Sequence, residues 1–214
     1  MVMTIAIALV VILISMTLHE AMHGFVAYWL GDDTARAQGR LTLNPVKHID
    51  PFLTILLPVM LAIAGAPIFG GAKPVPFNPN QLRYDEWGAA LVAIAGPLTN
   101  FIIAFIAFGI ATLSGVNVIE GLSSTDLWPR FISMAVVVNL GFFVFNMIPI
   151  PPLDGSRVLY ALAPDFVRRG MEAIEQFGII LVFAIVLLAS SVIGQFMVTV
   201  IAVILEFFSK IFAG

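Results

Sequence analysis

The sequence predicts an all-α integral membrane protein with about five spans and one additional apolar hairpin that enters and leaves the bilayer on the same side. Two observations support this fold class. Hydrophobic residues make up 60% of the 214 residues and charged residues only 11%, which is more apolar surface than a soluble core could bury. The apolar residues also fall in long runs, several of which reach the roughly 20 residues that a helix needs to cross a bilayer.

Charge and cysteine content narrow the classes of function. The formal net charge is −3, so nothing suggests binding to nucleic acid. Cysteine is absent, which excludes disulfides and thiolate ligands and leaves histidine and carboxylate side chains for any metal site. The chain shows no internal repeat or low-complexity linker, so we expect one transmembrane domain over residues 1–214, with a core over 1–170 and accessory C-terminal helices over 171–214.

The first apolar run, residues 2–30, contains the most informative motif. The run has no basic N-terminal region, so we expect a retained span and not a signal peptide. In His19-Glu20-Ala21-Met22-His23 the two imidazoles lie one helical turn apart on the same face, where both can bind one zinc ion with Glu20 beside them as a general base. Ionisable side chains are costly inside a span, and a bound metal offsets that cost. The alternative is a helix whose polar groups only form hydrogen bonds within a bundle.

The next segment is irregular. Residues 31–50 form a polar and basic connection that ends in a turn-rich stretch. A second apolar run, residues 52–69, is barely long enough for a span and is interrupted by Pro58 and Pro67. Residues 70–80 contain closely spaced prolines, which exclude a helix there.

Two long helices and an apolar C-terminal region follow. We expect helices over residues 86–114 and 128–147, joined by a short acidic loop. A single helix over residues 172–213 would be about 63 Å long, twice the thickness of a bilayer core. The polar break near Ser190 and Ser191 therefore favours two spans, and one span is the alternative.

A catalytic zinc ion takes three protein ligands and keeps one position open for water. Besides His19 and His23, the candidate ligands are His48, Asp50 and Asp154. We favour Asp154, because it follows a helix end broken by prolines, where an unwound backbone can bring a carboxylate into the protein interior.

The position of Asp154 has consequences for topology. It can meet His23 only if the helices over 2–30 and 128–147 run parallel, which makes the run 52–69 re-entrant. Most basic residues then lie on one side, as the positive-inside rule requires of the cytoplasmic side. We therefore expect a multi-pass cell-membrane protein with its N-terminus outside and with the metal site and the C-terminus on the cytoplasmic side. The basic residues on that side are Arg36, Arg40, Lys47, Lys73, Arg83, Arg157, Arg168, Arg169 and Lys210, and Arg130 lies on the other.

Three motifs in this order resemble those of the site-2 proteases, a family of intramembrane zinc metalloproteases. The motifs are His19-Glu20-Ala21-Met22-His23, Ala95-Gly96-Pro97-Leu98-Thr99-Asn100 and Asn146-x-x-Pro149-x-Pro151-x-Leu153-Asp154-Gly155. The chain is similar to the short prokaryotic members, since it has no room for the PDZ domain found in others. The resemblance implies a zinc metalloendopeptidase of regulated intramembrane proteolysis, with a transmembrane protein as substrate and the lipid bilayer as its surroundings.

The resemblance also implies roles for single residues. It makes Glu20 the catalytic base and assigns one zinc ion per chain to three ligands, which are His19, His23 and Asp154. It places Asn100 and Asn146 near the substrate backbone. The stretch 70–79 looks like the membrane-associated β-loop of the family, and an edge at Lys73 and Val75 could bind an unwound substrate by β-addition.

Several alternatives stay open from the sequence. Asn100 could form only a hydrogen bond between helices, and the stretch 70–79 could be a plain proline-rich turn. His48 is either a neighbour of the metal site or an ordinary loop histidine. For the whole chain, the competing functions are a membrane metal-binding or transport protein and an inactive homologue that binds transmembrane helices. The substrate and the oligomeric state are left open.

Overall fold

The computed structural model describes residues 2–63, 72–178 and 190–212, and all regular structure within them is helical. Four helices are long and apolar enough to cross a membrane: α1 (Val2–Trp29), α4 (Asp85–Leu113), α6 (Leu127–Asn146) and α10 (Ser190–Phe212). These findings are consistent with the expected all-α membrane protein. A fifth span was expected in the region that includes residues 179–189, which lie outside the described part.

The shorter helices connect the long ones. They are α2 (Thr34–Ala37), η1 (Pro45–Lys47), the π-helical turn η2 (Pro51–Leu56), α3 (Leu57–Ile63), η3 (Pro79–Gln81), α5 (Val118–Gly121), α7 (Asp154–Leu162) and α8 (Asp165–Glu175).

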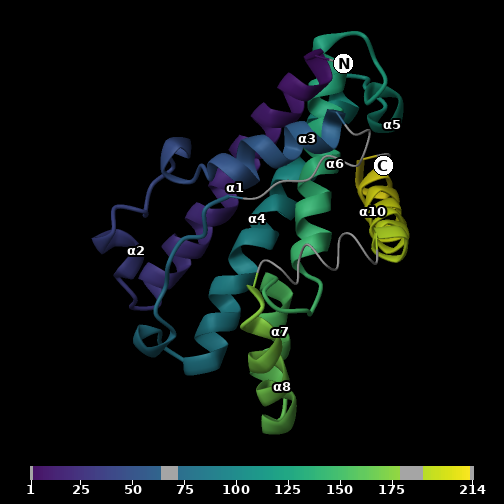
Figure 1. Ribbon diagram of the computed structural model, residues 1–214. Coiled ribbons are helices and arrows are strands. Elements are labelled where there is room, and N and C mark those ends of the chain that lie inside the picture. The colour runs from purple at the N-terminus through teal and green to yellow at the C-terminus, as the bar shows by residue number, and fades with distance from the viewer. Residues whose placement is uncertain (1, 64–71, 179–189, 213–214) are drawn as a thin grey trace.

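Helices α1, α4 and α6 pack against one another as a three-helix bundle (Figure 1). The N–H of Arg83 donates to the carbonyl of Leu30 at 2.8 Å, so the end of α1 lies beside the start of α4. The Arg130 guanidinium donates to the Thr4 hydroxyl at 2.8 Å, so α1 and α6 start at the same end of the bundle. Helices α1 and α6 are therefore parallel and α4 is antiparallel to both, as the sequence predicts.

Small residues allow α4 to approach α6 closely. Ala104, Ala107 and Ala111 recur along one face of α4 and pack against an apolar face of α6. Close approach of backbones through small side chains is typical of helices in membranes, where lipid gives little hydrophobic drive for association. Phe208 of α10 is fully buried against the same cluster, with its ring 5.1 Å from that of Phe105.

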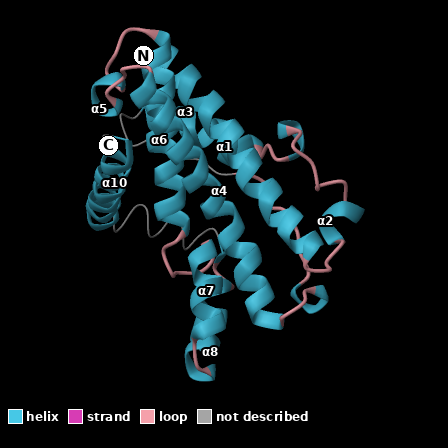
Figure 2. Ribbon diagram, turned by 180° about the vertical axis from the view of Figure 1, so that it is seen from behind, coloured by secondary structure: helices cyan, strands magenta, loops and turns pink. Residues whose placement is uncertain are grey.

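The described residues that flank the second apolar run lie together. The Lys73 N–H donates to the His48 carbonyl at 2.9 Å, so the chain leaves and returns at one place. A re-entrant hairpin requires this arrangement, although residues 64–71 lie outside the described part. From residue 72 the chain continues to Asn78 without regular secondary structure, and no strand occurs among the described residues (Figure 2). The β-loop stays a prediction.

The connection from α6 to α7 brings Asp154 back to the bundle. Gly155 makes this possible, because a Cβ at that position would lie only 2.3 Å from the Met147 carbonyl oxygen at the end of α6. Beyond α7, an ion pair between Arg157 and Glu175 joins α7 to α8. The expected apolar region from residue 172 thus begins later, because residues 172–175 belong to the polar helix α8.

Candidate active site

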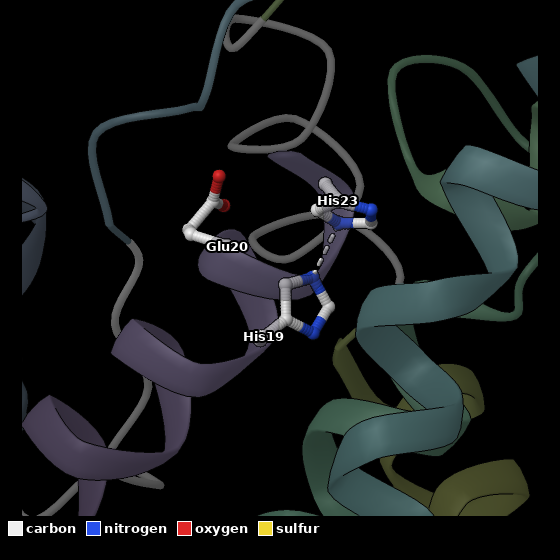
Figure 3. Close-up of side chains that lie close together, drawn as sticks. All are labelled: His19, Glu20 and His23. Carbon is white, nitrogen blue, oxygen red and sulfur yellow. Dashed lines mark hydrogen bonds between the residues drawn. The ribbon is translucent and has the colours of Figure 1, made fainter. Parts of the chain in front are cut away.

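The two imidazoles of α1 meet inside the bundle. His19 and His23 are 2% and 8% exposed, and their Nε2 atoms are 3.0 Å apart. Their rings lie almost perpendicular, and both point away from the α1 axis toward α4 (Figure 3). The one-turn spacing of the motif produces this meeting, because residues four apart share a helix face.

The outer nitrogens of both rings are held by hydrogen bonds. His23 Nδ1 lies 2.7 Å from the Val92 carbonyl oxygen, which can only accept, so Nδ1 carries the proton. His19 Nδ1 lies 2.6 Å from Oδ1 of Asn100 and donates to it in the same way. Each Nε2 then has its lone pair available on the side that faces the other ring, which is the tautomer that two histidine ligands of one metal ion need.

Asp154, from the first turn of α7, completes the cluster. Its carboxylate oxygens lie 3.2 Å from Nε2 of His19 and 3.6 Å from Nε2 of His23. Tetrahedral zinc with bonds near 2.1 Å separates its ligand atoms by about 3.4 Å, so the three groups fit one zinc ion. Oδ2 of Asp154 is buried and has no hydrogen-bond partner among the described residues, as expected of a metal ligand.

Burial raises the pKa of the Asp154 carboxyl, but the adjacent His23 and His19 side chains lower it further, and the net pKa lies below the usual range. The carboxylate is therefore ionised and requires a positive partner.

Gly96 of α4 leaves room for the cluster. A Cβ at this position would lie 2.4 Å from Nε2 of His23 and 2.6 Å from Nε2 of His19. Any other residue would therefore occupy space next to the two nitrogens that face the proposed metal position.

Glu20 belongs to the same cluster but is held by a different partner. Its carboxylate lies within 4.8 Å of the ligand nitrogens of His19 and His23. Oε2 accepts a hydrogen bond of 2.8 Å from the backbone N–H of Val75. Figure 3 shows the Glu20 carboxylate to one side of the imidazole pair. The carboxylates of Glu20 and Asp154 therefore both lie close enough to the imidazoles to share one metal site, and Glu20 differs in being held by a backbone N–H.

The segment that reaches Glu20, residues 72–78, is fastened at three points. Buried Arg40 donates from Nη2 to the carbonyls of Lys73 and Pro74, at 2.7 and 3.2 Å. Fully buried Asp32 accepts from the Asn78 N–H at 2.6 Å. These bonds hold the Val75 N–H against Glu20.

The remaining predicted residues lie in varied surroundings. Asn146 is half-buried at the end of α6 and donates to the Phe142 carbonyl at 3.0 Å. The Lys73 side chain is exposed. His48 is buried and donates from Nε2 to the Thr42 carbonyl at 2.8 Å. Asp50 accepts from the Phe52 N–H at 3.0 Å. The cluster that the described residues form around His19 and His23 includes neither His48 nor Asp50.

Sequence reasoning missed Asn139, Arg40 and Asp32 as parts of this arrangement. Asn139 of α6 accepts from the Asn100 amide at 2.9 Å and is 1% exposed. An amide in the middle of an apolar span was the available signal, because such a group needs a buried partner. Asp32 and Arg40 gave no comparable signal, since acidic and basic residues are ordinary in a loop.

Comparisons with known proteins agree with this geometry. The sequence model of Peptidase family M50 matches residues 7–190. The chain is 42% identical over 207 residues to "Putative zinc metalloprotease YwhC" of Bacillus subtilis, covering 95% of this chain and 91% of that protein. It is 31% identical over 188 residues to "Putative zinc metalloprotease Rip2" of Mycobacterium tuberculosis, covering 86% of this chain and 67% of that protein. No solved structure gave a significant match.

The matched region contains His19, His23 and Asp154, most of α1, all of α4 and α6, and no PDZ domain. The apolar helices place such a protein in a membrane, and the names of its relatives point to zinc as the metal. This chain belongs to Peptidase family M50, the site-2 proteases.

Proposed function

We propose that this protein is an intramembrane zinc endopeptidase that hydrolyses a peptide bond within or near the transmembrane segment of a membrane-protein substrate. One observation carries the proposal: three potential zinc ligands from α1 and α7 converge inside a bundle of apolar helices, with a second carboxylate beside them. Buried ionisable groups of this kind in a membrane protein are retained for function.

His19, His23 and Asp154 are the ligands we assign to zinc. A zinc ion held there supplies Lewis-acid activation of a water molecule and of the scissile carbonyl. Glu20 accepts the proton of the attacking water and delivers it to the leaving amine. The Val75 N–H engages Oε2 of Glu20 at 2.8 Å, which orients the carboxylate and leaves Oε1 for that proton.

The substrate has to unwind before it can be cut, because a helix hides its amides in internal hydrogen bonds. The extended segment that contains Lys73 and Val75 runs beside Glu20. The Lys73 N–H and carbonyl and the Val75 N–H already have partners in the protein, so the Val75 carbonyl is the group of these two residues that we propose to bind an unwound segment. Asn146 lies at the end of α6, before the connection to Asp154, and its half-buried amide can bind a substrate carbonyl. Asn100 has its amide engaged with His19, so it acts on the substrate through that ligand.

We assign the end of the bundle that carries Asp154 and α2 to the cytoplasmic side, because it carries most of the basic residues. The N-terminus then lies outside, at the same end as Arg130. We treat the chain as one metalloprotease domain, since the ligands come from both its first long helix and α7.

The test compares wild type with Glu20→Gln, both purified in detergent. Zinc content is measured by elemental analysis, and cleavage of a transmembrane peptide by mass spectrometry. We expect zinc in both proteins and cleavage only by the wild type. Equal cleavage by the variant would remove Glu20 as the base. Wild type that binds zinc without cleaving any transmembrane peptide would favour a metal-binding or transport protein.

A further inference from the structure

A continuous chain of buried hydrogen bonds links α6 to the zinc-site face of α1. Asn139 donates from Nδ2 to the Ala135 carbonyl of its own helix at 2.7 Å. Its Oδ1 accepts from Nδ2 of Asn100 at 2.9 Å, and Oδ1 of Asn100 accepts from Nδ1 of His19 at 2.6 Å. The three side chains are at most 2% exposed, so water cannot substitute for a lost partner.

The direction of every bond in this chain follows from its first member. The Ala135 carbonyl can only accept, so the NH₂ group of Asn139 faces it and Oδ1 of Asn139 faces Asn100. Asn100 must then present its NH₂ group to Asn139 and its oxygen to His19. The imidazole of His19 consequently carries its proton on Nδ1 and leaves Nε2 free.

The two histidines therefore differ in how their tautomers are set. His23 Nδ1 faces a backbone carbonyl, which cannot reverse its polarity. His19 Nδ1 faces a side-chain amide, and rotating that amide by half a turn would exchange its oxygen for an NH₂ group. The other contact of the Asn100 NH₂ group, with the Ser15 carbonyl, is 3.4 Å long and is too weak to prevent that rotation.

We propose that Asn139 is a positioning residue for the zinc site, because it fixes the orientation of the Asn100 amide and thereby the His19 tautomer that binds zinc. Without Asn139, Asn100 can turn its NH₂ group toward His19. The proton of His19 then moves to Nε2, which faces the metal position. This inference rests on the proposed function, since it takes His19 as a zinc ligand.

A second variant, Asn100→Asp, distinguishes an orienting role of Asn139 from a role in packing alone. A carboxylate accepts from His19 Nδ1 with either oxygen, so it needs no neighbour to orient it. Asn139 then becomes unnecessary. Asn139 is also unfavourable in this background. In its present orientation its oxygen faces the new carboxylate, and in the turned orientation its oxygen faces the Ala135 carbonyl.

The experiment measures the zinc dissociation constant of the full-length protein in detergent by competition with a chromophoric chelator. The proteins are wild type, Asn139→Leu, Asn100→Asp and the double variant. Ser133→Ala serves as the control, because Ser133 is also fully buried on α6 and its hydroxyl has no partner among the described residues. The absorption spectrum of the cobalt-substituted proteins reports the ligand geometry independently of activity.

We expect Asn139→Leu to weaken zinc binding by about 10- to 100-fold, the usual effect of removing a group that orients a ligand. In the Asn100→Asp background the same change should produce no loss or a gain, and Ser133→Ala should behave as wild type. Equal losses in both backgrounds would show that Asn139 only supports packing, and no loss in either would show that it has no role. Both results would overturn the inference, whereas absence of zinc from the wild type would overturn the proposed function itself.

Discussion

The substitution Gly96→Ala tests the geometry of the zinc site with a single methyl group. The added Cβ would lie 2.4 Å from Nε2 of His23 and 2.6 Å from Nε2 of His19. Carbon atoms and their neighbours normally stay about 3.5 Å apart, so the methyl group is short of space by about 1 Å. Either α4 moves away from α1 or both imidazoles rotate.

Each response has a predictable energetic consequence. Overpacking of this kind costs about 1–3 kcal/mol. Rotation of the rings breaks the buried hydrogen bonds of His19 to Asn100 and of His23 to Val92, and each unsatisfied group costs about 1–3 kcal/mol. If about 2 kcal/mol, the middle of these ranges, is lost from zinc binding, the dissociation constant rises about 30-fold.

The assay is chelator competition on the purified variant, with Gly141→Ala as the matched control. Gly141 lies in α6, and a Cβ there would meet no atom within 4 Å, so the control should bind zinc as the wild type does. Thermal unfolding of both variants reports whether the helices still pack. Zinc binding by Gly96→Ala with wild-type affinity would refute the placement of the two Nε2 atoms against α4.

Two further predictions concern other parts of the molecule. Val75→Pro removes the N–H that binds Glu20. The lost bond to a charged group, worth about 1.5–3 kcal/mol, should lower kcat by about 10- to 100-fold with zinc content unchanged. Val75→Ala keeps the N–H and should retain activity, so equal kcat values for the two variants would contradict the orienting role. Phe208→Ala removes a fully buried ring between α10 and the α4–α6 cluster and should destabilise the protein by about 3–5 kcal/mol. The loss is measured as a lower Tm in detergent, and zinc affinity should be retained. An unchanged Tm would mean that α10 does not pack there.

The long helices and their order were predictable because their signals are local. Apolar run length sets the bounds of α1, α4 and α6 to within about a residue of the predicted ones. The parallel arrangement of α1 and α6 followed from one requirement, that Asp154 reach His23, and the structure places these side chains 3.6 Å apart. The motifs therefore carried information about tertiary structure as well as chemistry.

The supporting contacts were not predictable, because they depend on which buried groups meet when the helices dock. Asn139 lies in an apolar span with no motif around it, and its role is visible only from its bond to Asn100. Asp32 and Arg40 looked like loop residues, yet they bind the backbone of residues 72–78 and so hold Val75 against Glu20. The polar helix α8 replaced the start of an expected apolar region, because residues 165–175 pair with α7 and α4 through Glu175 and Arg168.

The central claim is that two imidazoles of α1 and the carboxylate of α7 bind one zinc ion. X-ray absorption at the zinc edge, on the purified protein and on Asp154→Asn, tests it most directly. The account predicts one zinc per chain in the wild type, with two imidazole nitrogens and carboxylate oxygen at about 2.0–2.2 Å, and a weakened or altered shell in the variant. A wild-type shell without two imidazoles, or a shell that Asp154→Asn leaves unchanged, would contradict it.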